Sequence, residues 1–205
     1  MMTALVLVDI QNDFLPGGAL AVPEGDRVIP IANRLQASCS IVVATQDWHP
    51  ANHGSFAANH PGRNVFEQIQ LNGLPQTLWP VHCVQNTPGA DFAKALLQDR
   101  IAKVFQKGTD AGIDSYSGLF DNGRRKSTGL GEWLRSQGVT EVLVCGLATD
   151  YCVKFTALDA VGMGFETCLV EDACRGVDLN PGDVDRAVGE MRKAGVSILR
   201  STEVL

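Results

Sequence analysis

The sequence has no excess of basic residues, no long apolar run and no low-complexity segment. Lysine and arginine number 17 against 23 acidic residues, so the formal net charge is −6, and the longest basic run is Arg124-Arg125-Lys126. This charge balance provides no basic surface that would bind nucleic acid or an anionic membrane. It favours a small-molecule substrate instead.

The N-terminal segment also lacks the marks of a targeting sequence. Residues 1–8 contain no basic residues and no signal-peptidase cleavage site, and Asp9 interrupts the apolar stretch. This stretch is too short to cross a membrane. We therefore expect a buried first strand here, with no signal peptide and no membrane span.

The six cysteines do not form the regular pattern of a disulfide framework. They are irregularly spaced, and Cys145 and Cys168 lie inside apolar runs, as reduced buried thiols do. The sequence therefore predicts a cytoplasmic protein. With 205 residues, 45% of them hydrophobic, the chain can build one sizeable core, and we expect a single domain over residues 1–205.

Short apolar runs alternate with segments of helical spacing along the chain. The runs predict six strands, at 4–8, 41–44, 101–105, 142–145, 167–170 and 196–199, and helical spacing falls at 26–36, 90–97, 129–135, 152–161 and 183–194. Continuous apolar strands that alternate with helices are typical of a parallel sheet covered on both faces. The predicted fold is therefore three-layer α/β/α with a six-stranded, mainly parallel sheet.

One long segment, 46–89, breaks this alternation. It is rich in Pro, Gly, Asn and His, has little periodicity and exceeds the usual length of a connection inside a domain. Its aromatic residues, among them Trp48 and Trp79, argue against disorder. We expect a functional loop here.

Four chemically reactive side chains follow apolar runs. They are Asp9, Asp47, Lys107 and Cys152. In an open parallel sheet, reacting groups gather in the crevice outside the carboxyl ends of the strands. We therefore expect these side chains to meet there.

Cys152 is the strongest candidate for a nucleophile. The preceding run ends a strand at Gly146, turns, and enters a helix whose first residues include Cys152. A helix N-terminus favours a thiolate and lowers the thiol pKa, and its amides can line an oxyanion hole. The alternative, an inert buried thiol, is the commoner role of a lone cysteine.

Asp9 and Lys107 are candidates for a base and its partner. A carboxylate at the end of a central strand is partly desolvated, which raises its pKa and suits it to accept a proton from a thiol. A lysine that points inward between Asp9 and Cys152 would keep the carboxylate charged and stabilise a thiolate. A turn aspartate and a solvated surface lysine are the alternatives.

Asp47, His49 and His82 form a candidate metal site. Asp47 and His49 lie two residues apart, so on an extended segment their side chains fall on one side. Two histidines and a carboxylate suit zinc, iron or manganese and leave coordination positions open. His53 is a candidate fourth ligand, and the two tryptophans named above would flank a planar ring that carries a nitrogen. A local hydrogen-bonded turn is the alternative.

Together the motifs resemble the nicotinamidase/pyrazinamidase branch of the isochorismatase-like hydrolases, over nearly the whole chain. The resemblance rests on VDIQNDF at 8–14, QDWHP at 46–50, WPVHCVQ at 79–85, KG at 107–108 and GLATDYCV at 146–153. It implies Asp9 as the base, Lys107 as the third member of a triad and Cys152 as the nucleophile.

The resemblance also implies one divalent metal ion, with zinc expected before iron or manganese. Asp47, His49 and His82 match the family's ligands, while His53 matches a histidine that is a ligand in some members and only nearby in others. The implied cofactor is therefore a single ion held by three or four side chains.

The pocket implied by the resemblance has aromatic walls formed by Phe14, Trp79 and Tyr116. Its oxyanion hole would come from the amides of Ala148 and Cys152. The implied reaction is hydrolysis of nicotinamide to nicotinate and ammonia through a thioester, a step in NAD salvage, with pyrazinamide as a further substrate.

Other functions stay open on the residues alone. Two histidines and a carboxylate also describe a non-haem iron oxygenase, which would leave Cys152 without a role. A related amidohydrolase of the same fold would act on another small amide, and a non-enzymatic module would retain a ligand without turnover. The sequence does not fix whether the chain forms a homo-oligomer.

Overall fold

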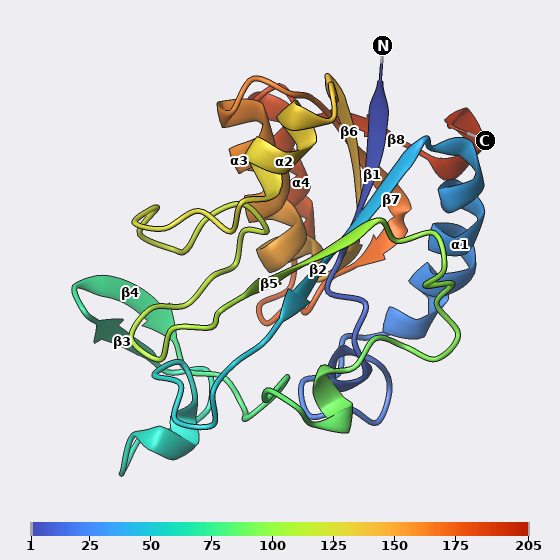
Figure 1. The fold of residues 1–205 in the computed structure, drawn as a ribbon. Helices are drawn as coiled ribbons and strands as arrows, with labels where there is room; N and C mark the ends of the chain where they lie inside the picture. Colours follow the sequence, from blue (N-terminus) through green and yellow to red (C-terminus); the bar gives the residue numbers. More distant parts are fainter. Residues whose placement is uncertain (1, 205) are drawn as a thin grey trace.

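A six-stranded sheet forms the centre of the computed structural model, which describes residues 2–204 (Figure 1). Its strands are β1 (Thr3–Val8), β2 (Ile41–Asp47), β5 (Lys103–Lys107), β6 (Glu141–Leu147), β7 (Glu166–Arg175) and β8 (Ser197–Leu199). They lie in the order β5-β2-β1-β6-β7-β8, and every neighbouring pair is parallel. All six predicted strands are present.

Helices cover both faces of this sheet. On one side lies α1 (Val28–Ser38), and on the other lie α2 (Leu130–Ser136), α3 (Lys154–Gly162) and α4 (Asp183–Lys193) (Figure 1). Five of the six residues of β1 are buried, because this central strand has neighbours on both edges and helices on both faces. The predicted three-layer α/β/α architecture is confirmed.

Within residues 2–204 the structure contains no helix with the length and apolar character needed to cross a bilayer.

The helix predicted at 90–97 is absent, and this prediction is wrong. A short 3-10 turn, Pro88–Ala90, is followed by irregular backbone. This backbone bonds in part to another segment: the amide of Ala93 donates to the carbonyl of Ile10, and the amide of Asn12 donates to the carbonyl of Asp91, each at 2.9 Å. The helical pattern arose from apolar residues that are buried at three-residue spacing, which are Ala90, Ala93 and Leu96.

The segment 46–89 carries an antiparallel hairpin that the sequence analysis did not predict. Its strands are β3 (Gln68–Leu71) and β4 (Leu74–Thr77). Asn72 and Gly73, which join them, have φ angles of 47° and 83°. A two-residue hairpin turn of type I′ needs positive φ at both positions, and Asn-Gly is the pair that adopts it most readily.

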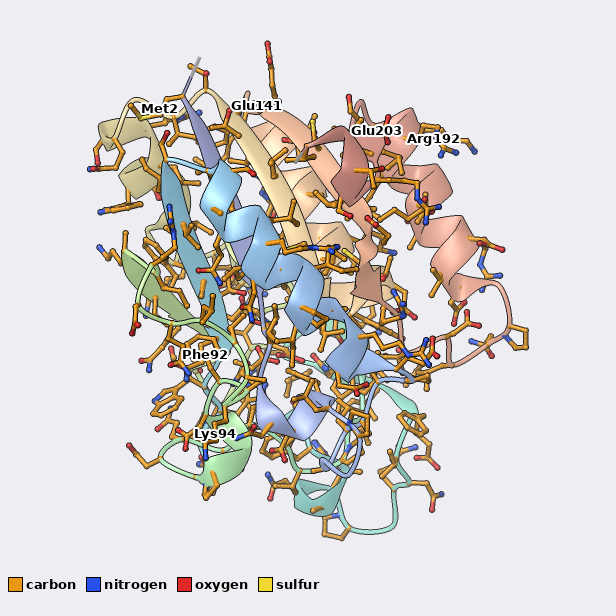
Figure 2. All side chains as sticks on the ribbon, turned by 90° about the vertical axis from the view of Figure 1, so that its right-hand side faces the viewer. Met2, Phe92, Lys94, Glu141, Arg192 and Glu203 are labelled. Carbon is orange, nitrogen blue, oxygen red and sulfur yellow. The ribbon has the colours of Figure 1, made fainter. Side chains whose placement is uncertain are left out.

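Long irregular segments follow β1 and β2 at the carboxyl end of the sheet. In Figure 2, Met2 and Glu141 mark the amino ends of β1 and β6, and Phe92 and Lys94 lie toward the opposite end of the molecule. The hairpin β3–β4 lies beyond the same carboxyl end (Figure 1). The long connection between β2 and β5 therefore encloses the edge at which an open parallel sheet binds its ligands.

Candidate active site

The carboxyl edge of the sheet brings the four reactive side chains together. Asp9 follows β1 directly, Asp47 ends β2 and Lys107 ends β5, and the register of β2 with β5 pairs Asp47 with Lys107. Cys152 lies in a π-helical turn, Thr149–Val153, between β6 and α3. All four side chains are buried. Residues far apart in the sequence therefore form one cluster because their strands end side by side.

Lys107 is the centre of this cluster. Its Nζ lies 2.9 Å from Asp9 Oδ2 and 3.4 Å from Cys152 Sγ, and it donates a hydrogen bond to the Ser115 carbonyl at 2.8 Å. It also forms an ion pair with Oδ1 of Asp47. Burial alone lowers the pKa of Lys107, but Asp47 and Asp9 raise it well above its usual value. The side chain is therefore a fixed cation between two carboxylates and the thiol.

Asp9 and Cys152 both hold their protons more tightly than usual. Burial raises the pKa of Asp9, and Lys107 and a 2.6 Å hydrogen bond from Thr45 Oγ1 offset this only in part. Burial also raises the pKa of the Cys152 thiol well above its usual value, against the opposing effect of Lys107. Burial therefore favours the protonated form of both groups.

The expectation that a helix N-terminus lowers the Cys152 pKa is wrong. Cys152 sits inside a π-helical turn that precedes α3, so it does not occupy the first turn of an α-helix. Complete burial of the thiol outweighs the favourable charge of Lys107. Among the neighbouring groups, Lys107 lowers the thiol pKa, whereas Asp9 and Asp47 raise it further.

Asp47 divides its two oxygens between Lys107 and a pair of histidines. Oδ1 faces Lys107, whereas Oδ2 lies 3.6 Å from His49 Nε2 and 3.9 Å from His82 Nε2. Burial raises the pKa of Asp47, but Lys107 and His49 lower it much more, so the carboxylate is ionised. Burial and the neighbouring His49 lower the pKa of His82 to about 4. His82 is therefore a neutral imidazole, the form that binds metal ions.

Backbone carbonyls fix the orientation of both imidazoles. His49 Nδ1 lies 2.9 Å from the Gly108 oxygen, and His82 Nδ1 lies 2.8 Å from the Pro80 oxygen. A ring nitrogen in such a contact carries the proton, so Nε2, turned toward Asp47, is the lone-pair atom of each neutral ring. Burial lowers the pKa of His49, but Asp47 raises it above its usual value. The ligand atoms of Asp47, His49 and His82, the metal trio, all lie within 4.8 Å of one another. These residues fit a divalent metal ion.

His53 lies beside the metal trio. Its ring centroid is 4.4 Å from that of His49, and its Nδ1 lies 2.7 Å from Ser55 Oγ. With His49 and Asp114 it forms a second group whose ligand atoms lie within 4.8 Å of one another. Among residues 2–204 its buried Nε2 has no hydrogen-bond partner. A nearby cation or a water would satisfy this nitrogen.

Aromatic side chains line a pocket next to the metal trio and Cys152. Trp79 Nε1 donates a hydrogen bond to Tyr116 Oη at 3.1 Å, and the indole meets Tyr151 edge-on with ring centroids 4.8 Å apart. The pocket therefore borders both the thiol and the metal trio. The lining residues are Phe14, Leu20, Asp47, His49, Trp79, His82, Asp114, Tyr116, Ala148, Tyr151, Cys152 and Val177.

The model of the isochorismatase domain matches residues 3–203. The chain belongs to the isochorismatase family. It is 54% identical to the nicotinamidase of Escherichia coli (strain K12) over 199 residues, 95% of this chain and 93% of that protein.

Solved structures of the family superpose on this chain closely. The Acinetobacter baumanii nicotinamidase/pyrazinamidase has a TM-score of 0.96 and 48% identity, with 99% of this chain and 98% of that one covered. The Pyrococcus horikoshii pyrazinamidase in complex with zinc has a TM-score of 0.78 and 41% identity, with coverage of 98% and 99%. The isochorismatase fold is therefore shared over essentially the whole chain.

Among residues 2–204, Trp48 is not one of the residues that line the pocket. The prediction that it flanks a planar ring is therefore wrong. Asp47 and His49 point to one side of an extended segment, and the residue between them therefore points to the other. Trp48 packs against the hydrophobic core instead. Trp79 does line the pocket, as predicted.

Sequence reasoning missed four residues of the pocket wall. Tyr151 adjoins Cys152, and Asp114 lies two residues before Tyr116, so closeness to a predicted residue was the available signal. The other two come from loops that carry no motif. The missed residues are Leu20, Asp114, Tyr151 and Val177.

Proposed function

We propose that this chain is a nicotinamidase, which hydrolyses nicotinamide to nicotinate and ammonia and also accepts pyrazinamide. One observation carries the proposal: Lys107 lies between Asp9 and Cys152 and shares Asp47 with the metal trio, in a chain 54% identical to a nicotinamidase. A nucleophile, a base and a fixed cation beside a metal-binding cluster form the set that amide hydrolysis needs.

In the proposed first half-reaction, Asp9 takes the proton from Cys152 Sγ while Lys107 stabilises the thiolate. The thiolate attacks the carboxamide carbon, and the amides of Ala148, whose preceding peptide bond is cis, and of Cys152 bind the resulting oxyanion. Asp9 then gives its proton to the nitrogen, the C–N bond breaks and ammonia leaves. Cys152 is left as a thioester of the ring acid.

In the second half-reaction, the ionised Asp9 takes a proton from a water molecule that attacks the thioester carbon. The C–S bond breaks, the ring acid leaves and loses its proton to solvent, and Cys152 recovers a proton from Asp9. The raised pKa of Asp9 suits this role, because a base must hold the proton and return it at neutral pH.

Asp47, His49 and His82 are the proposed ligands of one divalent ion, with His53 as a further candidate. Bound there, the ion supplies a Lewis acid for the ring nitrogen or for water. The zinc in the Pyrococcus horikoshii pyrazinamidase supports zinc before iron or manganese. Two histidines and a carboxylate leave coordination positions open for such a ligand.

Phe14, Trp79 and Tyr116 are the proposed substrate contacts. Their faces and edges suit a planar aromatic amide held between the thiol and the metal trio. We assign the reaction to NAD salvage in the cytoplasm, which the six free cysteines support. The family match over residues 3–203 supports one isochorismatase-like domain for residues 1–205.

Ammonia release from nicotinamide by the purified chain tests this proposal. We expect release by the wild type and none above background by Cys152→Ala. The control Cys168→Ala, which removes a buried thiol from β7, should keep wild-type release. A chelator should abolish release and added zinc should restore it.

Two results would contradict the proposal. If the wild type released no ammonia from nicotinamide or pyrazinamide, the substrate would be another small amide. Full turnover by Cys152→Ala would remove the thiol from the mechanism.

A further inference from the structure

The hairpin β3–β4 has no part in the mechanism above, yet one of its side chains reaches the site. Gln76 on β4 is buried, and its Nε2 lies 2.7 Å from the Thr77 carbonyl oxygen and 2.9 Å from Asp114 Oδ2. A third oxygen, Tyr116 Oη, lies 3.3 Å from the same nitrogen. The amide must present its nitrogen here, because its oxygen would face a carboxylate and a carbonyl.

Gln76 therefore contacts both ends of the short segment 114–116. At the first end lies Asp114. One of its carboxylate oxygens lies within 4.8 Å of a ring nitrogen of His49 and of a ring nitrogen of His53. Its Oδ1 accepts a hydrogen bond from the next backbone amide at 2.8 Å. Gln76, on β4, donates a hydrogen bond to the other oxygen, Oδ2. Both oxygens of the Asp114 carboxylate are therefore held.

The rest of segment 114–116 contacts the other parts of the site. The Ser115 carbonyl accepts the hydrogen bond from Lys107 Nζ at 2.8 Å. Tyr116 Oη accepts the hydrogen bond from Trp79 Nε1 at 3.1 Å and so fixes the aromatic wall. One amide group thus restrains a segment that touches the metal side, the cation and the ring wall.

The hairpin has a second attachment to the same loop. Asn72 Nδ2 donates a hydrogen bond to the Gly112 carbonyl at 2.7 Å. The outer strand β3 is exposed or half-buried along its length, so it adds little to the core. Two side chains of the hairpin, those of Asn72 and Gln76, therefore bond to the loop 108–116.

We propose that Gln76 is a positioning residue, which sets the separation between the carboxylate beside the metal trio and the aromatic wall. This inference rests on the proposed nicotinamidase function. The ring wall and the metal side contact substrate in the ground state and in the transition state alike. Loss of their spacing therefore acts on KM more than on kcat.

Gln76→Met tests the proposal, because it keeps the length of the side chain and removes the donor. We expect KM for nicotinamide to rise about tenfold while kcat falls less than about threefold. Nicotinamide binding to zinc-loaded Cys152→Ala, measured by calorimetry, should weaken by the same factor when Gln76→Met is added. Zinc affinity, measured against a chromogenic chelator, should fall about tenfold.

Gln70→Met is the matched control, since Gln70 is an exposed glutamine on the other strand of the same hairpin. It should leave KM, nicotinamide binding and zinc affinity unchanged. Unchanged values in Gln76→Met, or equal changes in the two variants, would overturn the proposal.

Two further outcomes are decided by additional measurements. If Gln76→Met does not fold, Gln76→Asn keeps an amide that is one methylene too short, and a normal KM in that variant overturns the proposal. A wild type that does not turn over nicotinamide counts against the proposed function alone. The zinc affinities of Gln76→Met and Gln70→Met then decide the role of Gln76, and equal affinities overturn it.

Discussion

At Gly108 the backbone turns with a φ of 63° and passes against His49, so that an added Cβ would overlap the Cε1 atom of the ring. The same residue provides the carbonyl that holds His49 Nδ1. We expect Gly108→Ala to displace the imidazole and to weaken zinc binding at least about tenfold, as measured by chelator competition. Gly189→Ala in α4, where a Cβ meets nothing within 4 Å, is the control. Equal zinc affinity in both variants would contradict this expectation.

Thr45 favours the charged form of Asp9 through its hydrogen bond to Oδ1. Thr45→Val keeps the shape and removes the donor, so the pKa of Asp9 should rise further. Because the base must be ionised, we expect the acidic limb of the kcat/KM profile to move to higher pH and kcat to fall about tenfold. Thr167→Val, in β7, removes a hydrogen bond to the carbonyl of Phe165 and should leave the profile unchanged. An unshifted acidic limb in Thr45→Val would argue against Asp9 as the base.

Strands with a local signal were predicted, whereas elements that depend on other segments were not. The six strands of the main sheet need continuous apolar residues because both faces are covered, and those runs are plain in the sequence. The segment 90–97 has helical spacing, yet its backbone bonds to neighbouring loops. The hairpin turn at Asn72 and Gly73 has a recognisable signal, which the low periodicity of segment 46–89 concealed.

The features of the candidate site also divide into those that the sequence predicts and those that only the folded chain defines. The two-residue spacing of Asp47 and His49 placed both side chains on one side of an extended segment, and the same rule excludes Trp48. The contacts of Gln76 with segment 114–116 join two loops whose relative placement only the folded chain defines. The raised thiol pKa of Cys152 likewise depends on burial by the complete molecule.

Asp172 joins β7 to the C-terminal turn Ser201–Glu203. Its two oxygens accept hydrogen bonds from Ser201 N and Ser201 Oγ, each at 2.7 Å. Burial raises the pKa of Asp172, but these hydrogen bonds lower it below its usual value. The group therefore stabilises the fold at neutral pH, and this contribution is lost as pH falls through the folded-state pKa.

We expect Asp172→Asn to lower Tm by about 2 °C at pH 7 and by less at pH 3. Thermal unfolding followed by circular dichroism at the two pH values measures the difference. Glu171→Gln, at an exposed position on the same strand, should show no such pH-dependent difference. An Asp172→Asn deficit that stays constant with pH would show that the charge is not the cause.

The metal trio connects distant parts of the chain, since two of its members lie at the end of β2 and the third follows the β3–β4 hairpin. A ligand that binds only the folded chain stabilises it by about 2.7 kcal/mol at a concentration 100 times its Kd. We therefore expect zinc added to chelator-stripped protein to raise Tm by about 5–10 °C. Differential scanning calorimetry measures the shift.

Two histidine variants separate the metal trio from other histidines. His82→Ala should lose the zinc-dependent rise in Tm. His60→Ala removes a ring that bonds to the Gly54 carbonyl outside the trio and should keep the rise. If added zinc leaves the Tm of the wild type unchanged, the assignment of the metal ligands is contradicted.

On the ribosome, β1, β2 and β5 are made before β6, although β6 lies between β1 and β7 in the finished sheet. The nascent chain therefore carries β1 with one edge unpaired, and such an apolar edge is prone to join other chains. Asp9, Asp47 and Lys107 are all synthesised while the thiol of Cys152 is still missing. Insertion of β6 pairs this edge of β1, and Cys152 follows β6 by five residues in the chain, so the strand that covers the edge also brings the thiol to the site.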